Sequence, residues 1–333
     1  MTIGTRIMLK DRKPLINLLP LEAPLVLFVD PCDACNSKCS FCPTSDRDLM
    51  KKHNRPLKAM SMELFKKIVD DLQDFKTKVK VLRMYTHGEP LVNHKFCEMV
   101  EYAKQSDKIE MIDTTTNGLL LKPSLNRKLV DAGIDRINIS VNGINAEQYL
   151  EFSGVTMDFQ NFVNNIKDLY ENKKDTYIFI KINGDTISEE DEKKFLEIFE
   201  PIADSVAIEK AFNCWSDFEA KGFNKSDDNV GIYGQEIKKE VQICPYIFYQ
   251  LSINSDGNFS LCFLDWNRKL IISNVSIQSV KDVWNSNKLK EYRIKMLEGK
   301  RYSIPSCKNC NQLIGGMPED LDEYKIKLLK EYR

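Results

Sequence analysis

The stretch Cys35-Asn36-Ser37-Lys38-Cys39-Ser40-Phe41-Cys42 directs the interpretation of the whole chain, because it places three thiols at spacings of four and three residues. A four-iron cluster normally takes four Cys thiolates, and no fourth Cys follows at a comparable spacing. The spacing therefore predicts an iron-sulfur cluster with one iron left open to another ligand. A zinc site is the alternative, because Cys32 and Cys35 form a CxxC pair of the kind that zinc sites use.

The composition limits the class of protein. The chain has 333 residues with 42% hydrophobic content, enough for a large core, and 48 basic against 49 acidic residues give a net charge of −1. This balance offers no attraction to nucleic acid or to an anionic membrane. No apolar run approaches the roughly 20 residues of a spanning helix, and the first residues lack a secretory signal. We therefore expect a cytoplasmic protein that uses its ten cysteines for metal or redox chemistry.

Apolar runs alternate with helical periodicity over the first two thirds of the chain. The run Leu25-Val26-Leu27-Phe28-Val29 predicts a strand buried on both faces, directly before the cysteine loop. Six β-α units with short connections imply a parallel sheet, whose active site lies at the C-terminal ends of the strands. Further strands are expected at 79–85, 109–116, 134–141, 177–182 and 206–211, and helices after Ser61 and at 95–105, 123–132, 146–152, 159–170 and 189–199.

The cysteine loop resembles the CxxxCxxC loop of the radical S-adenosylmethionine (SAM) enzymes. In that family the amino and carboxylate groups of SAM chelate the open iron, and reductive cleavage of SAM gives a 5′-deoxyadenosyl radical that abstracts hydrogen from carbon. The resemblance implies an α/β fold, a partial (β/α)6 TIM-like barrel with the cluster loop after its first strand. It also implies SAM as a cofactor and an electron donor such as flavodoxin or ferredoxin as a partner.

The segment Tyr85-Thr86-His87-Gly88-Glu89-Pro90 follows the second expected strand. Gly88 would allow close approach to a ligand, and Glu89 offers an acceptor for an ammonium group. The segment looks like the family's GGEP motif, which holds the amino group of SAM, although His87 stands where the motif has its first Gly. A capping turn into the next helix is the structural alternative.

Small polar residues end the next strands and are further candidates for SAM contacts. Asn117 lies in Thr114-Thr115-Thr116-Asn117-Gly118, and Ser140 and Asn142 lie in Ser140-Val141-Asn142-Gly143. These segments resemble the family's TNG and S-x-D-G segments, with Asn142 where Asp is common, and simple turns are the alternative. By the same argument Lys181 is placed beside SAM, and Phe41 beside its adenine.

Four later cysteines predict a second cluster: Cys244, Cys262, Cys307 and Cys310. With the strand expected at 247–253, the turn at Asp256-Gly257 and the strand reaching Cys262, they resemble the SPASM or twitch domain of radical SAM enzymes, here a small β-hairpin and helix domain. Four thiolates would saturate one four-iron cluster, and structural zinc is the alternative. The molybdenum-cofactor enzyme of the superfamily has a differently spaced C-terminal trio, so we do not assign the chain to it.

The expected domains are a lead-in at 1–24, a radical SAM core at 25–220, an auxiliary-cluster domain at 235–312 and a helix at 313–333. Three thiols remain outside both clusters, namely Cys32, Cys97 and Cys214. Cys97 lies on an amphipathic helix and is expected to pack in the core. Cys214 follows the sixth strand, where a thiol could return a hydrogen atom to a substrate radical.

We expect a radical SAM oxidoreductase with two 4Fe-4S clusters that acts on a small carbohydrate or aminoglycoside-like substrate. The auxiliary cluster favours dehydrogenation, as in the aminoglycoside-pathway dehydrogenase that this layout resembles, whereas epimerisation would need a hydrogen donor such as Cys214. A peptide or protein maturase is the second hypothesis, and it is less favoured because no leader-binding domain or third cluster is evident. A non-catalytic zinc protein is the third.

Overall fold

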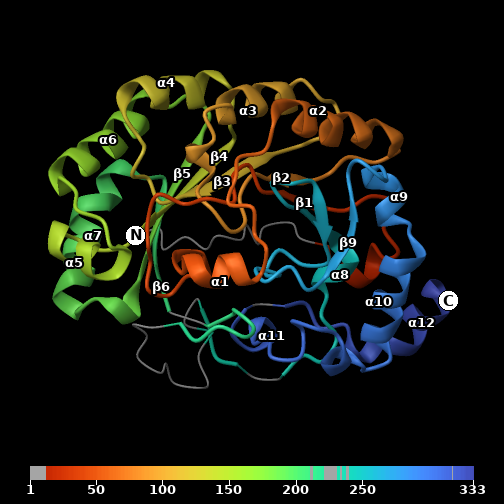
Figure 1. The fold of residues 1–333 in the computed structure, drawn as a ribbon. Helices are drawn as coiled ribbons and strands as arrows, with labels where there is room; N and C mark the ends of the chain where they lie inside the picture. Colours follow the sequence, from red (N-terminus) through yellow and green to blue (C-terminus); the bar gives the residue numbers. More distant parts are fainter. Residues whose placement is uncertain (1–12, 211–212, 221–230, 233–234, 238–239, 317) are drawn as a thin grey trace.

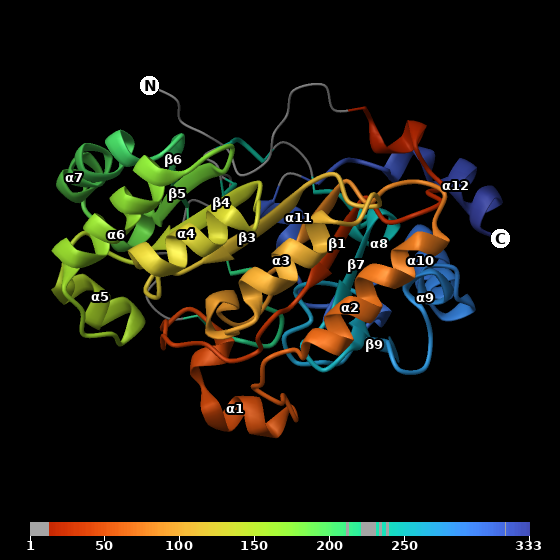
Figure 2. The ribbon, with the colours of Figure 1, turned by 90° about the horizontal axis from the view of Figure 1, so that it is seen from above.

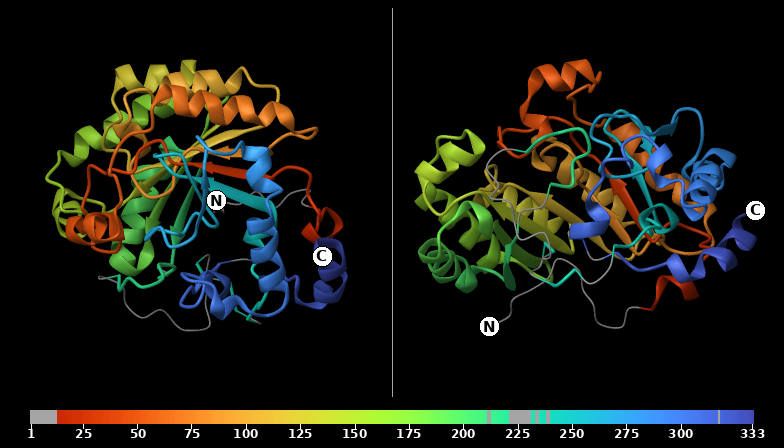
Figure 3. Two further views of the ribbon diagram at one scale, coloured as in Figure 1. Left: turned by 45° about the vertical axis from the view of Figure 1, so that its right-hand side comes forward. Right: turned by 90° about the horizontal axis from the view of Figure 1, so that it is seen from below.

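A curved sheet organises the chain (Figure 1). The computed structural model describes residues 13–210, 213–220, 231–232, 235–237, 240–316 and 318–333. Within these residues nine strands form one sheet in the order β6-β5-β4-β3-β2-β1-β7-β8-β9. Its described strands bend into an arc that leaves β6 and β9 as the two edges (Figure 3).

The first six strands are parallel and run in sequence order across the sheet, which confirms the predicted partial (β/α)6 barrel. Each expected strand is present, although three of them begin two or three residues later than predicted. The end of the last expected strand, at Ala211, lies outside the described residues. The strands are β1 (Val26–Val29), β2 (Val81–Arg83), β3 (Ile112–Thr116), β4 (Arg136–Val141), β5 (Tyr177–Asn183) and β6 (Ser205–Glu209).

The helices between these strands cover the outer face of the arc (Figure 1). Local sequence starts most of them: the side chains of Ser61, Asn145 and Asp158 each accept a backbone N–H in the first turn, and Ser188 forms a capping box with Asp191. The helices are α2 (Met62–Asp70), α3 (Phe96–Lys104), α4 (Pro123–Asp131), α5 (Ala146–Ser153), α6 (Phe159–Asn172) and α7 (Glu189–Phe199).

A short helix, α1 (Arg47–Lys52), was not expected from the sequence. The Asp46 side chain caps it by accepting the N–H groups of Asp48 and Leu49. Figure 2 shows α1 on a projecting segment, apart from the row of outer helices. Its place directly after the cysteine loop makes it part of the surroundings of the site.

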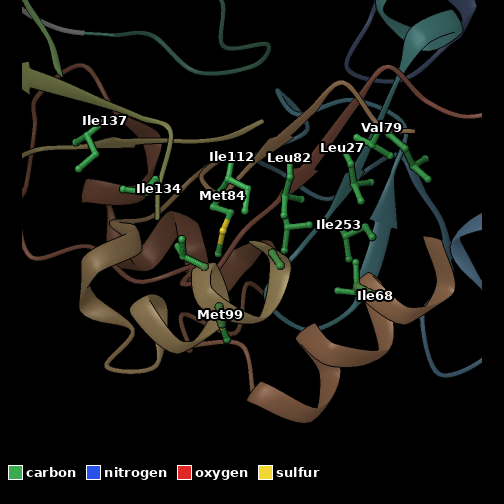
Figure 4. Packing of buried hydrophobic residues seen from close by; sticks show 14 of the residues in the cluster. Leu27, Ile68, Val79, Leu82, Met84, Met99, Ile112, Ile134, Ile137 and Ile253 are labelled. Carbon is green, nitrogen blue, oxygen red and sulfur yellow. The ribbon is translucent and has the colours of Figure 1, made fainter. Parts of the chain in front are cut away.

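The main core lies between the outer face of the sheet and the helices (Figure 4). Leu27, Leu82 and Ile112 are buried side by side on neighbouring strands, and Ile68 of α2 and Met99 of α3 meet them from the helix layer. Burying such side chains contributes roughly 1.5–3 kcal/mol each. This layer therefore holds the strand ends, and the loops that follow them, in fixed positions.

The C-terminal part extends the same sheet. Strand β7 (Gln250–Ile253) is parallel to β1. The predicted turn at Gly257, whose φ is +82°, leads from β7 into the antiparallel strand β8 (Asn258–Ser260). Strand β9 (Ile271–Asn274) is antiparallel to β8 and ends the sheet. The remaining elements are α8 (Tyr246–Tyr249), α9 (Val280–Trp284), α10 (Asn287–Leu297), α11 (Gln312–Gly315) and α12 (Lys325–Tyr332).

Three expected elements are partly wrong. The strand expected to reach Cys262 ends at Ser260, and in place of the single helix expected at 313–333 the described residues form α11 (Gln312–Gly315) and α12 (Lys325–Tyr332). The strand predicted from Ile247 begins only at Gln250, because residues Tyr246–Tyr249 form a helical turn after Pro245. All four residues of β7 are buried, so this strand does not show the alternation expected of a hairpin with one exposed face. No helix in the described residues has the length and apolar character needed to cross a bilayer.

Candidate functional site

The three thiols of the cysteine loop lie at the C-terminal end of β1. The loop is fastened to the end of α5, where Lys38 N–H donates to the Ser153 carbonyl oxygen at 2.8 Å and Ser40 N–H to that of Phe152 at 3.0 Å. Within the loop Cys42 N–H donates to the Cys39 carbonyl oxygen at 3.1 Å. The backbone thus holds Cys35, Cys39 and Cys42 in one turn-rich segment.

Polar side chains reach the sulfur atoms of this loop. The Ser37 hydroxyl lies 3.2 Å from Cys39 Sγ and 3.8 Å from Cys35 Sγ. Two residues predicted from the strand ends are also here: Asn142 Nδ2 donates to Cys39 Sγ at 3.5 Å, and Asn117 Nδ2 to Cys35 Sγ at 3.8 Å. Donors aimed at sulfur stabilise thiolates and are a feature of cluster sites.

Burial raises the pKa of all three thiols, that of Cys39 to about 12. For Cys39 the neighbouring Cys42 thiolate adds to the effect of burial on the pKa. Three such groups ionise together only when a cation compensates their charge, and metal binding supplies that compensation. The donor set therefore suits iron bound through deprotonated sulfur.

Gly88 explains how the second motif approaches the cysteine loop. A Cβ atom at this position would overlap the carbonyl oxygen of Cys32 and lie 2.6 Å from that of Ala34. Directly afterwards Glu89 N–H donates to the Ala34 oxygen at 2.9 Å. The close approach that the structure shows is thus between two loops of the chain, and only Gly permits it.

Glu89 is 3% exposed and receives three hydrogen bonds. Its Oε1 accepts from Thr116 Oγ1 at 2.6 Å and Leu91 N–H at 3.1 Å, and its Oε2 accepts from Asn117 N–H at 2.8 Å. A carboxylate offers about four acceptor positions, so Oε2 keeps one for a further donor. Burial raises the pKa of Glu89 to about 7, and the three hydrogen bonds oppose that rise.

The other residues expected around SAM lie further along the same end of the sheet. Ser140 and Lys181 are neighbours in the register of β4 and β5. Lys181 pairs with Glu209 at the end of β6, so its charge already has a partner. Phe41, which lies between Cys39 and Cys42 in the sequence, is half-buried.

The four later thiols share one electrostatic environment. Burial raises the pKa of Cys262 well above its usual value, and Cys244, Cys310 and Cys307 add to the rise in that order. Burial raises the pKa of Cys244 to about 12, with Cys310 the next cause. The fold therefore brings four thiols from distant parts of the sequence, Cys244, Cys262, Cys307 and Cys310, into one neighbourhood.

A single zinc ion needs its donors close together. Thiolates around one zinc ion lie within about 4 Å of one another, since each zinc-sulfur bond is about 2.3 Å. In the described part of the chain no three His, Cys, Asp or Glu side chains converge in the manner that a single ion needs.

Cys214 lies between the two groups of thiols. Burial raises the pKa of Cys214 to about 12, and the thiolates of Cys310 and Cys42 add to the rise. Asn309 Nδ2 donates to Asp217 Oδ1 at 3.0 Å, which fastens this segment to the last CxxC pair. The thiol is therefore protonated and near both sites.

Cys32, the doubtful fourth ligand, has a structural place. It is 1% exposed, forms an isolated bridge with Ala59, and has its pKa raised by burial to about 11. Cys97 packs against the core between α3 and its neighbours, as expected. Ser37 and Thr44 were not predicted as site residues, although hydroxyl side chains inside or next to a cysteine loop are a recognisable signal for sulfur contacts.

Comparison with known proteins places both segments in families. The model of the Radical SAM superfamily matches residues 29–200, and that of the SPASM iron-sulfur cluster-binding domain matches residues 244–311.

Curated relatives match a smaller part. A probable GTP 3',8-cyclase of Methanococcus maripaludis strain C5 is 38% identical over 116 residues, which are 34% of this chain and 35% of the relative. The probable GTP 3',8-cyclase of Methanocaldococcus jannaschii is 32% identical over 133 residues, 40% of this chain and 41% of the relative. The chain thus spans less than half of these relatives, and their activity does not transfer to it.

Solved structures share the fold over most of the chain. Streptococcus suis SuiB bound to precursor peptide SuiA has a TM-score of 0.65 and 17% identity, over 90% of this chain and 72% of that one. BtrN in complex with AdoMet and 2-DOIA has a TM-score of 0.52 and 19% identity, over 86% of this chain and 92% of that one. Native anSMEcpe with bound AdoMet has a TM-score of 0.59 and 16% identity, over 93% of this chain and 96% of that one.

The superfamily match covers more than half of the chain, and it begins at the end of β1, just before the thiol loop. Its cofactors are a 4Fe-4S cluster and SAM, and the SPASM match adds an auxiliary iron-sulfur centre. The chain belongs to the radical SAM superfamily and carries a C-terminal SPASM domain.

Proposed function

We propose that this enzyme takes a hydrogen atom from a carbon of a small, carbohydrate-like or aminoglycoside-like substrate and oxidises the substrate by two electrons. The cluster at Cys35, Cys39 and Cys42, together with SAM, would supply the radical that takes the hydrogen atom. The remaining acceptor position on Glu89 fits the ammonium group of SAM. A flavodoxin or ferredoxin is the proposed electron donor.

The inner face of the barrel supports a polar substrate. Leu82 and Met84 of the second strand segment belong to the helix-side core, so Arg83 and Tyr85 point to the opposite face, inside the barrel. Arg83 Nη1 donates to the Tyr85 hydroxyl at 3.0 Å, and Arg83 Nε lies 3.6 Å from Asp113 Oδ2. Charged groups buried in this way favour a ligand rich in hydroxyl or amino groups.

The buried ion pair of Lys181 and Glu209 is the observation that carries the proposal. Glu209 ends β6 and Lys181 lies on the neighbouring β5, and their side chains are 9% and 15% exposed. Ile180 and Ile182 belong to the helix-side core, so by alternation Lys181 faces the inside of the barrel. The charge of Lys181 acts on Cys214, so the pair lies near the thiol between the two clusters. A hydroxyl or amino group of a substrate there would find both a donor and an acceptor.

The auxiliary site favours oxidation over a redox-neutral outcome. Four thiolates from Cys244, Cys262, Cys307 and Cys310 would leave no iron open for a substrate. Such a saturated centre is suited to accept the electron that a substrate radical must lose. In this proposal Glu209, the carboxylate of the buried ion pair, would take the proton that leaves a hydroxyl group at the same step.

The test is anaerobic turnover with SAM, a reductant and panels of amino sugars, cyclic polyols and short peptides. We expect a product from the sugar or polyol panel that is two hydrogen atoms lighter, with one 5′-deoxyadenosine formed per product. Glu209→Gln should abolish product formation while SAM binding persists. Turnover confined to the peptides would favour a peptide maturase, and a product of unchanged mass would favour epimerisation.

A further inference from the structure

A buried group of charged side chains lies next to the cysteine loop, and the function proposed above assigns it no role. The side chains of Arg55 and Asp33 are fully buried and form an ion pair, with Arg55 Nε donating to Asp33 Oδ1 at 3.1 Å. Arg268 Nη2 donates to the same Oδ1 at 3.1 Å. One carboxylate is therefore shared by two guanidinium groups, one from the segment after the cysteine loop and one from the SPASM domain.

Thr44 connects this group to a cluster ligand. Arg55 Nη1 donates to Thr44 Oγ1 at 3.1 Å, and the Thr44 hydroxyl donates to the His87 carbonyl oxygen at 2.7 Å. Thr44 lies in the turn Pro43–Ser45 that follows Cys42, where Ser45 N–H donates to the Cys42 carbonyl oxygen at 3.1 Å. Burial raises the pKa of the Cys42 thiol, and hydrogen bonding by Thr44, followed by the Arg55 charge, opposes the rise. The Arg55 charge, held in place by the Thr44 hydroxyl, thus favours negative charge on this sulfur.

The same interactions act on a metal cluster bound there. Adding an electron makes a cluster more negative, so donors to its sulfurs and nearby cations raise its reduction potential. We propose that Arg55 and Thr44 set the reduction potential of the cluster bound by Cys35, Cys39 and Cys42, and that Arg268 links this potential to the SPASM domain through Asp33. The inference rests on the assignment of the first cluster to these three thiols.

The role of Arg268 follows from the charges. Without Arg268, Asp33 and Arg55 would neutralise each other, and little positive charge would remain behind Cys42. With Arg268 present the group of three carries a net positive charge. Asp30 is a further acidic group near Arg268, and burial, followed by the Asp33 charge, raises its pKa to about 7. His87 stays neutral, because burial and then the two arginines lower its pKa.

Arg268 has a strained backbone conformation within the SPASM domain. Its φ is +57°, in the left-handed region that residues with a Cβ avoid. Asp265 stabilises this turn, since its Oδ1 accepts Lys269 N–H at 3.1 Å and its Oδ2 accepts Leu270 N–H at 2.9 Å. The turn thus fixes the backbone from which the Arg268 side chain reaches Asp33.

The test is a redox titration of the reconstituted two-cluster enzyme at fixed pH, followed by electron paramagnetic resonance. Added SAM changes the signal of the first cluster and so identifies it. Thr44→Val should make reduction of the first cluster about tenfold less favourable, a shift of about 59 mV to lower potential for one electron. Thr44→Ser, which keeps the hydroxyl, should leave the potential unchanged.

Arg268 provides a second, independent variant outside the cysteine loop. Arg268→Gln should lower the potential of the first cluster in the same direction by a smaller amount, and Arg268→Lys should restore it. Arg301→Gln is the matched control, because the Arg301 charge acts on Cys244, Cys307 and Cys310 instead. It should shift the auxiliary cluster and leave the first cluster unchanged.

The outcomes separate this inference from the assignment of the cluster. If Thr44→Val keeps full iron and the SAM-dependent signal but titrates like the unchanged enzyme, the redox role of Thr44 is wrong and the cluster assignment stands. If Arg268→Gln leaves the first potential unchanged, the link between the domains is wrong. If Thr44→Val loses the first cluster, the comparison of Arg268→Gln with Arg268→Lys tests whether this charged group sets the reduction potential.

Discussion

Gly88 and Cys32 stand so close that a methyl group on the first would overlap the carbonyl oxygen of the second. We therefore expect Gly88→Ala to push the cysteine loop away from the Glu89 turn and to prevent assembly of the first cluster. Reconstituted iron should fall from about eight to about four atoms per chain, as for loss of one four-iron cluster. Iron and sulfide analysis measures this directly.

Gly299→Ala is the control for backbone strain alone. Gly299 has φ +76°, but the nearest atom to a new Cβ would be Lys325 Nζ at 3.8 Å. This variant should lose about 1 kcal/mol of stability from the left-handed conformation and keep both clusters. Full iron in Gly88→Ala would show that the loops can separate without loss of the site.

A combined change of Cys35, Cys39 and Cys42 to Ala should remove one cluster and spare the other. We expect about four irons per chain to remain, since the auxiliary thiols come from a different part of the chain. SAM cleavage should stop. The matched change of Cys244, Cys262, Cys307 and Cys310 should leave the SAM-dependent spectral change of the first cluster. Stoichiometric zinc and a colourless protein would contradict the assignment of both sites.

Glu89→Gln should weaken SAM binding by about 1.5–3 kcal/mol, the value of a hydrogen bond between charged groups. The pH dependence gives a second readout. The pKa of Glu89 is raised by burial to about 7, so the carboxylate is lost as the pH falls below that value. SAM affinity should then decrease toward low pH in the unchanged enzyme, whereas the Gln variant should show no such decrease.

Thr116→Val tests whether the pKa of Glu89 controls the pH dependence of SAM binding. It removes the 2.6 Å hydrogen bond to Glu89 Oε1, which favours the carboxylate, so the pH at which SAM affinity declines should move upward. Calorimetric titration at several pH values would show the displacement. An affinity independent of pH in the unchanged enzyme would mean that Glu89 only closes a turn.

Cys214→Ala distinguishes dehydrogenation from epimerisation. If the substrate radical loses its electron to the auxiliary cluster, the variant should still turn over and give the oxidised product. Because burial raises the pKa of Cys214 to about 12, the thiol carries the hydrogen atom that epimerisation would need. Solvent deuterium on the product carbon, with no product from the variant, would therefore overturn the proposed oxidation.

The parallel half of the fold could be read from the sequence because its signals are local. Buried strands appear as apolar runs such as Leu25–Val29, and Ser61, Asn145 and Ser188 mark helix starts with capping side chains. The thiols were found by spacing alone. Helix α1 was missed although Asp46 caps it, because six residues give too little periodicity.

Long-range relations could not be read in this way. The pairing of β7 with β1, the sharing of Asp33 by Arg55 and Arg268, and the place of Gly88 against Cys32 each join segments that no periodicity connects. The helical turn at Tyr246–Tyr249 was taken for strand because its aromatic and β-branched residues favour both states. Tertiary contacts decide such positions.

The pairing of Val26 with Gln250 also has a consequence for synthesis on the ribosome. These partners are 224 residues apart in the chain, which corresponds to roughly 10–45 s of translation at 5–20 residues per second. During that time β1 can pair with β2 but not with β7, so the cysteine loop that follows β1 lacks the contacts of the C-terminal part of the chain. Insertion of iron and sulfide should therefore follow release of the chain, and a stalled or truncated product should expose an aggregation-prone strand.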